Sequence, residues 1–129
     1  MISIIGGKYK GSKLQVPLKN VRPTSAIKRS AIFSVLESYA LKNSYNLYEN
    51  QCFIDIFAGS GSLGLEAISR GARFSYFFEN NSKVLKILKK NCIKICKEKN
   101  YAIILHDIFY SNFSDINIPI STIFLDPPY

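Results

Sequence analysis

CFIDIFAGSGSLG, residues 52–64, is the stretch that decides the fold. It begins as a short apolar run and then places glycines at 59, 61 and 64, which is the G-x-G-x-x-G spacing. A strand that runs through such a loop into a helix is typical of nucleotide-binding α/β domains, because the glycines allow a tight turn and a close approach of the backbone to the ligand. The stretch therefore predicts the first strand, glycine loop and first helix of such a domain.

Downstream of this stretch, apolar runs alternate with amphipathic segments. We expect helices over 63–70 and 82–99, and strands over 52–57, 74–78, 101–105 and 122–125. Gly71 stands where a left-handed helix cap favours glycine, and Asn81 or Ser82 can cap the second of these helices. Strands that are apolar on both faces and alternate with helices indicate a doubly wound α/β sheet.

Upstream of it, the first 51 residues follow a different pattern. Short strands over 2–5 and 13–16 predict a hairpin, and Thr24 or Ser25 can cap a helix. The apolar positions of that helix recur at helical spacing: Ile27, Ala31, Ile32, Val35, Leu36 and Tyr39. Residues 42–51 are polar and rich in turn formers. We therefore expect an N-terminal hairpin and helix over 1–45 and a sheet domain over 46–129.

Charge is concentrated at the N-terminus. The chain has 129 residues and a net charge of +8, yet residues 1–36 hold seven basic side chains and no acidic one. Abundant lysine can reflect an AT-rich genome, but that bias does not explain why acids are absent from this segment. The segment is predicted to bind an anionic partner. The lysines over 83–99 are interpreted, by default, as a solvated helix face.

Membrane and disulfide classes are not favoured. No run reaches the roughly 18 apolar residues that a membrane span needs, and the chain turns polar at Gly6. The three cysteines (Cys52, Cys92 and Cys96) lack a zinc-like pattern and are interpreted as buried, reduced thiols of a cytoplasmic protein. No metal site is expected.

Two acidic residues, Asp55 and Glu79, indicate which nucleotide cofactor the glycine loop would bind. Asp55 lies four residues before Gly59, where a dinucleotide would place its pyrophosphate. Two like charges 4 Å apart repel by roughly 4 kcal/mol at an effective dielectric near 20. S-adenosylmethionine carries an α-ammonium instead, so Asp55 favours it over NAD; a capping role for Asp55 in the loop is the alternative. Glu79 ends the second strand, where a carboxylate can accept from ribose hydroxyls.

The fourth strand ends in Asp126-Pro127-Pro128-Tyr129. A side-chain acceptor beside a proline carbonyl, in a turn stiffened by two prolines, suits an exocyclic amino group on a base. Tyr129 can stack on that base, at about 1–3 kcal/mol. The alternative is an ordinary turn at a strand end. At the end of the third strand, Asp107 can accept from an adenine amino group or cap a helix, and His106 has no partner set that suggests chemistry.

Taken together, these motifs resemble the RsmD family of bacterial methyltransferases, which act on guanine N2 in 16S ribosomal RNA. The resemblance covers essentially the whole chain. It is carried by residues 4–11 (IIGGKYKG), 22–25 (RPTS), 55–61 (DIFAGSG), 66–67 (EA), 69–72 (SRGA) and 125–129 (LDPPY). It implies a Rossmann-like methyltransferase fold, S-adenosylmethionine as methyl donor, and 16S rRNA or a small-subunit particle as partner.

The resemblance also implies roles for individual residues. The cofactor would be held by Asp55, Phe57, Gly59, Gly61, Glu79 and Asp107. The target base would meet the catalytic residues Asp126, Pro127 and Tyr129. RNA would contact Lys8, Lys10, Arg22, Thr24, Lys28 and Arg29.

The sequence departs from the family in two places. After Thr24-Ser25 the family usually continues with Asp-Arg and then Arg-Glu, where this chain has Ala26-Ile27 and Arg29-Ser30. The family also continues past the motif at 126–129, so of a usual strand order 3-2-1-4-5-7-6 this sequence is expected to supply 3-2-1-4, with the C-terminal strands missing. The fourth strand would then be an open apolar edge. The sequence leaves open whether the chain is a fragment or the product of a split or decayed gene. It also leaves open whether a second chain supplies the missing half or the chain is a monomer.

Two other functions stay open as well. The motif at 126–129 also suits a DNA adenine-N6 or cytosine-N4 methyltransferase, although the chain has no room for a separate target-recognition domain. A non-catalytic RNA-binding remnant would keep the basic arm and bind RNA with a strong salt dependence, without cofactor affinity.

Overall fold

A parallel four-stranded sheet forms the centre of the molecule. The computed structural model describes residues 1–18, 24–105 and 116–127. The strands are β3 (Cys52–Asp55), β4 (Phe74–Phe78), β5 (Tyr101–Ile104) and β6 (Ile120–Phe124). Their order is β5-β4-β3-β6, and every neighbouring pair is parallel. This confirms the predicted order 3-2-1-4.

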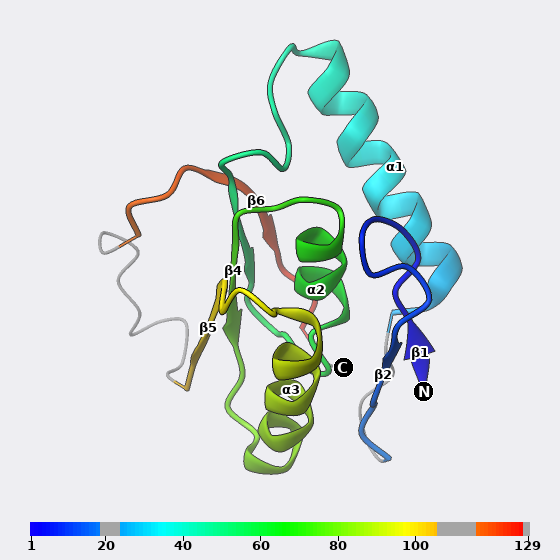
Figure 1. Ribbon diagram of the computed structural model, residues 1–129, viewed down its shortest axis with the longest axis vertical. Helices are drawn as coiled ribbons and strands as arrows, with labels where there is room; N and C mark the ends of the chain where they lie inside the picture. The colour runs from blue at the N-terminus through cyan, green and yellow to red at the C-terminus, as the bar shows by residue number, and fades with distance from the viewer. Residues whose placement is uncertain (19–23, 106–115, 128–129) are drawn as a thin grey trace.

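The helices and the N-terminal hairpin lie together on one face of the sheet (Figure 1). Helix α2 (Ser62–Ser69) and helix α3 (Ser82–Ile95) follow β3 and β4. Helix α1 (Ala26–Lys42) and the antiparallel pair β1 (Ile2–Ser3) and β2 (Lys13–Leu14) lie beyond α2. Ser25 accepts from the Lys28 N–H and Asn81 from the N–H groups of Lys83 and Val84, so α1 and α3 each have a side-chain N-cap.

The main hydrophobic core runs through both parts of the chain. It joins Ile4 and Leu14 of the hairpin and Phe33 of α1 to residues of the sheet and of α2 and α3. The Phe33 ring lies 6.4 Å from that of Phe53 in β3 and 5.8 Å from that of Phe124 in β6. The hairpin and α1 are therefore packed on the sheet domain; the boundary after residue 45 stays a prediction.

The orientation of α1 differs from the predicted one. Ile27, Val35 and Tyr39 are 84%, 68% and 60% exposed, whereas Arg29, Phe33 and Ala40 are the buried residues of the helix. The apolar periodicity predicted a different buried face of the helix, because an apolar pattern does not count a charged residue such as Arg29. That guanidinium can be buried since a carboxylate of α2, described below, compensates its charge.

Smaller differences concern the ends of elements. Helix α3 ends at Ile95 rather than Lys99, and β6 starts at Ile120 rather than Thr122. The outer strand β6 leaves Ile120 and Ile123 40% and 50% exposed. Among the described residues, no helix combines the length and the apolar character needed to cross a membrane.

Candidate functional site

Three carboxylates follow the strands at one edge of the sheet. Asp55 is the last residue of β3, Glu79 follows β4 directly, and Asp126 lies two residues after β6. Because the carboxyl ends of parallel strands meet at the same edge, these three acids converge there. Asp55 is only 2% exposed, Glu79 is half-buried and Asp126 is exposed.

Asp55 is a buried acid that forms no ion pair with any cation among the described residues. Its pKa is raised to about 7, mainly by burial and in part by the neighbouring charges of Asp126 and Glu79, while a hydrogen bond from the Gly64 backbone lowers it. The ion pairs among the described residues join Arg29 and Arg70 to Glu66, and Arg70 to Glu37; none includes Asp55. The site is therefore a negatively charged corner that would favour a cationic ligand.

The glycine loop turns around Glu79. Gly59 and Gly61 have φ angles of +56° and +85°, in the region that glycine adopts without strain. The Gly59 N–H donates to Glu79 Oε1 at 2.9 Å, and the Asn81 N–H donates to Oε2 at 3.0 Å. The carboxylate is thus fixed by backbone groups, and its remaining lone pairs can still accept from hydroxyls.

The last two glycines of the pattern have packing roles. A Cβ on Gly61 would lie 2.6 Å from Leu88 Cδ1, and a Cβ on Gly64 would overlap the Phe77 ring. Without a side chain at Gly64 helix α2 can approach β4 closely, and without one at Gly61 the start of α2 can lie against α3. The predicted site residue Phe57 lies in the same loop and is 39% exposed.

Asn91 of α3 links the glycine loop to the hairpin. Its Nδ2 donates to the Ser60 carbonyl at 2.8 Å and to the Gln15 carbonyl at 2.9 Å, while its Oδ1 accepts from the Gln15 N–H at 3.0 Å. The side chain is 2% exposed. Asn91 thereby fixes the position of β2 relative to the loop.

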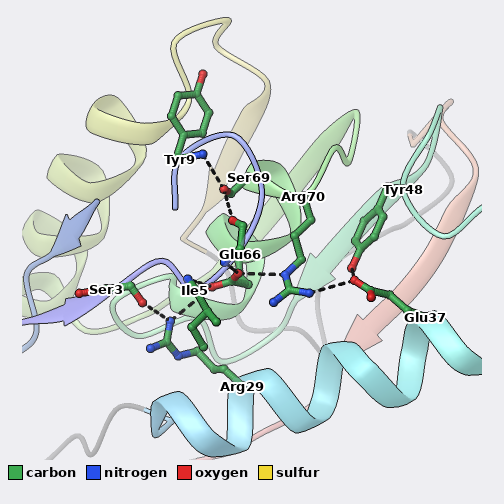
Figure 2. A network of polar contacts seen from close by, with 10 residues as sticks. Ser3, Ile5, Tyr9, Arg29, Glu37, Tyr48, Glu66, Ser69 and Arg70 are labelled. Carbon is green, nitrogen blue, oxygen red and sulfur yellow. Dashed lines mark hydrogen bonds and ion pairs between the residues drawn. The ribbon is translucent and has the colours of Figure 1, made fainter. Parts of the chain in front are cut away.

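Glu66 of α2 holds the other end of the hairpin (Figure 2). It is fully buried and accepts from the N–H groups of Ile5 and Gly6, each at 2.9 Å. Arg70 Nε donates to it at 2.9 Å, and the Arg29 guanidinium lies 3.5 Å away. One carboxylate therefore joins the hairpin, α1 and α2.

The same network extends outward along α1. Arg70 also pairs with Glu37 at 2.9 Å, and Tyr48 donates its hydroxyl proton to Glu37 at 2.7 Å. The Arg70 guanidinium lies 4.8 Å from the centre of the Phe33 ring. Burial and Glu37 together raise the pKa of Tyr48, so the hydroxyl keeps its proton and stays a donor.

The structure corrects one predicted RNA contact. Arg29 is 1% exposed, and its guanidinium donates to the carbonyls of Ser3 and Thr24 and faces Glu66. Its prediction as an RNA contact is wrong, because a guanidinium that is buried against Glu66 cannot meet a phosphate. Lys8, Lys10 and Lys28 are exposed, and Thr24 is half-buried.

Some predicted site residues lie outside the described residues. They are Arg22, Asp107, Pro128 and Tyr129. Within residues 1–18, 24–105 and 116–127, no group of three or more His, Cys, Asp or Glu could hold a metal ion. The structure therefore brings together Asp55, Gly59, Gly61, Glu79 and Asp126 at one edge of the sheet.

Sequence reasoning missed two residues that organise the site. Glu66 is the one acid in the otherwise uncharged α2, and Asn91 is the one amide on the apolar face of α3. Both were visible as polar residues at positions where the helical period requires burial. Their partners could not be read locally, since they lie 60 and 76 residues away in the sequence.

Comparison with known proteins gives concordant results. The model of the Conserved hypothetical protein 95 family matches residues 2–129. Two curated relatives are each named Ribosomal RNA small subunit methyltransferase D. The protein from Buchnera aphidicola subsp. Acyrthosiphon pisum is 42% identical over 99% of this chain and 63% of its own length, and that from Escherichia coli K12 is 34% identical over 99% and 60%.

A solved structure has the same arrangement. Escherichia coli yhhF superposes with a TM-score of 0.73 at 31% identity, over 99% of this chain and 64% of that one. The chain therefore spans less than two thirds of the length of the relatives that it matches.

Proposed function

The chain belongs to the Conserved hypothetical protein 95 family, the RsmD family indicated by its motifs, and from this premise we propose that it methylates the N2 amino group of a guanine in 16S rRNA, with S-adenosylmethionine as the methyl donor. The names of the two relatives support an rRNA substrate and methyl transfer. The guanine N2 position rests on the resemblance of the chain's motifs, taken together, to the RsmD family.

The buried carboxylate of Asp55 is the observation that carries this proposal. Within the part of the chain that the structure describes it has no cation as an ion-pair partner, and two other acids raise its pKa. A ligand with positive charge relieves this repulsion, whereas a pyrophosphate would increase it. S-adenosylmethionine fits, because it carries an α-ammonium and a sulfonium and no phosphate.

Other residues of the site suit the remainder of that cofactor. Glu79 is held by the Gly59 and Asn81 N–H groups and has lone pairs free to accept from ribose hydroxyls. Gly59 and Gly61 let the loop backbone come close to the ligand, and Phe57 offers an exposed ring at the same loop. Asp107 is proposed to accept from the adenine amino group.

Asp126, Pro127 and Tyr129 are proposed to hold the target base. The Asp126 carboxylate and the Pro127 carbonyl accept hydrogen bonds from the two N–H groups of the amino group. These hydrogen bonds direct the nitrogen lone pair toward the methyl donor. Tyr129 stacks on the ring of the base. S-adenosylmethionine supplies an electrophilic methyl group, and the residues of the chain contribute proximity and orientation without a covalent enzyme intermediate.

The RNA is proposed to meet the basic N-terminal arm. Lys8, Lys10 and Lys28 are exposed, and the segment 1–36 contains no acid. Together with Arg22 and Thr24 these residues would contact phosphates of 16S rRNA or of a small-subunit particle, in the cytoplasm.

A methyl-transfer assay tests this function. Small-subunit particles that lack the modification are incubated with the chain and methyl-labelled S-adenosylmethionine, and the labelled nucleoside is identified. We expect N2-methylguanosine from the wild type, a loss of at least about 100-fold in Asp126→Ala, consistent with removal of an orienting group, and full activity in the exposed control Glu49→Gln. The absence of labelled RNA, or a product on adenine or cytosine in duplex DNA, would overturn the proposal.

A further inference from the structure

Helix α3 carries a one-signed charged face that the proposed site does not use. Residues 80–97 contain six lysines and no acid, and all six side chains are exposed. The core-facing residues are Val84, Leu88, Asn91, Cys92 and Ile95. The five lysines within α3 therefore occupy the remaining surface of the helix, and Lys97 follows its end.

Three of these lysines form a row beside the hairpin. Lys83, Lys90 and Lys94 are spaced by seven and four residues, so they lie along one side of the helix. Lys94 Nζ donates to the Lys13 carbonyl of β2 at 2.7 Å, which fixes the side on which the row lies. Asn91, three residues before Lys94, makes the paired hydrogen bonds to Gln15.

The row continues onto the hairpin without an intervening acid. Lys13 is exposed next to Lys94, and residues 1–18 contain no Asp or Glu. Because Asn91 is buried and bonded to both Gln15 and Ser60, the helix and the hairpin hold a fixed mutual position. We call the set Lys13, Lys83, Lys90 and Lys94 the lysine row.

The lysine row also leads toward the carboxylate site. Lys83 lies at the start of α3, four residues after Glu79, and Lys94 lies about 16 Å further along the helix axis. Four cations of one sign over that length attract a polyanion whose charges repeat along a backbone.

We propose that the lysine row is a second contact for the phosphate backbone of RNA, which the hairpin and α3 form together. The inference rests on the proposed function, because it takes the partner of that function to be RNA. It adds a surface on the sheet domain to the N-terminal arm, so that the RNA contacts both the hairpin and the helix that follows Glu79.

The salt dependence of RNA binding tests this surface. A 16S rRNA transcript is titrated, without cofactor, with the wild type, with a row variant (Lys83→Gln, Lys90→Gln and Lys94→Gln) and with a control (Lys42→Gln, Lys89→Gln and Lys99→Gln). Both variants lose three exposed lysines and reach the same net charge, but the control leaves the row intact. Thermal unfolding of each variant shows that it is folded.

The row variant is expected to bind roughly tenfold or more weakly at 0.1 M salt, and the slope of log K against log salt to become shallower by about 2–3, since each phosphate contact contributes about 0.7–0.9. The control is expected to change the slope by less than about 1. Equal effects of the two variants, or none, would overturn the lysine row and leave the proposed methyl transfer untouched. Absence of RNA binding by the wild type would overturn both the row and the RNA partner, whereas loss of S-adenosylmethionine binding alone would affect only the proposed function.

Discussion

Two buried carboxylates in this molecule have opposite environments. Glu66 is completely buried and accepts from two backbone N–H groups and Arg70, with Arg29 close by. Asp55 is 2% exposed, has no cation in an ion pair among the described residues, and has two acids as neighbours. The Glu66 charge therefore stabilises the fold. The Asp55 charge lowers the free energy of unfolding until a cationic ligand compensates it.

The largest expected effect lies on the Glu66 side of this comparison. Glu66→Ala leaves Arg29 buried without its counter-charge and two N–H groups of the hairpin without an acceptor. We expect the free energy of unfolding to fall by about 3–5 kcal/mol, measured by urea denaturation. The exposed control Glu98→Ala should change it by less than about 0.5 kcal/mol. A loss below about 1 kcal/mol in Glu66→Ala would show that the two carboxylates do not differ as described.

The opposite sign is expected at Asp55. Asp55→Asn keeps the shape of the side chain but removes a charge that burial disfavours. At pH 8 the variant should be more stable than the wild type by about 2 kcal/mol, while S-adenosylmethionine binding is lost. Glu49→Gln, at an exposed position, should change stability by less than about 0.5 kcal/mol. A variant at Asp55 that unfolds more easily than the wild type at pH 8 would contradict the assignment of an uncompensated charge.

The pH dependence sharpens the same contrast. The pKa of Asp55 is raised from 3.8 to about 7, so between these values the native state binds more protons than the unfolded one. The contribution of Asp55 to the free energy of unfolding therefore falls as pH rises through this window, and it is smallest above pH 7. We expect the difference in stability between wild type and Asp55→Asn to develop from about pH 4 to pH 7. A flat difference over that range would rule out a raised pKa.

The smallest effect is expected at the outer end of the Glu66 network. Tyr48→Phe removes one hydrogen bond to Glu37, whose carboxylate keeps its ion pair with Arg70. A loss of about 0.5–1 kcal/mol is expected in chemical denaturation. Tyr45→Phe serves as the matched control on the loop after α1. If Tyr48→Phe were as damaging as Glu66→Ala, the network would not be centred on Glu66.

Features that depend on local sequence were predictable. The glycine loop and the acids Asp55 and Glu79 at strand ends follow from residues 52–79, where each strand and its loop are close in the chain. The strand order was implied by the resemblance to the RsmD family. The caps at Ser25 and Asn81 were predicted for the same reason, because a cap bonds within three residues.

Features that depend on partners far away in the sequence could not be predicted. The apolar pattern of α1 suggested a face with Ile27 and Val35, yet the helix buries Arg29. That burial depends on Glu66, 37 residues later, and no periodicity contains such a pairing. Asn91 likewise depends on Gln15, 76 residues earlier.

Calorimetric titration of S-adenosylmethionine into the wild type and into Asp55→Asn, at pH 7 and in two buffers of different ionisation enthalpy, measures affinity and proton release together. With the Asp55 pKa near 7 in the free protein, binding of a cation should release up to about half a proton from the wild type. Asp55→Asn should neither bind with wild-type affinity nor release that proton. Absence of binding by the wild type, or equal affinity and proton release in both proteins, would contradict the role of Asp55 as the carboxylate held ready for the methyl donor.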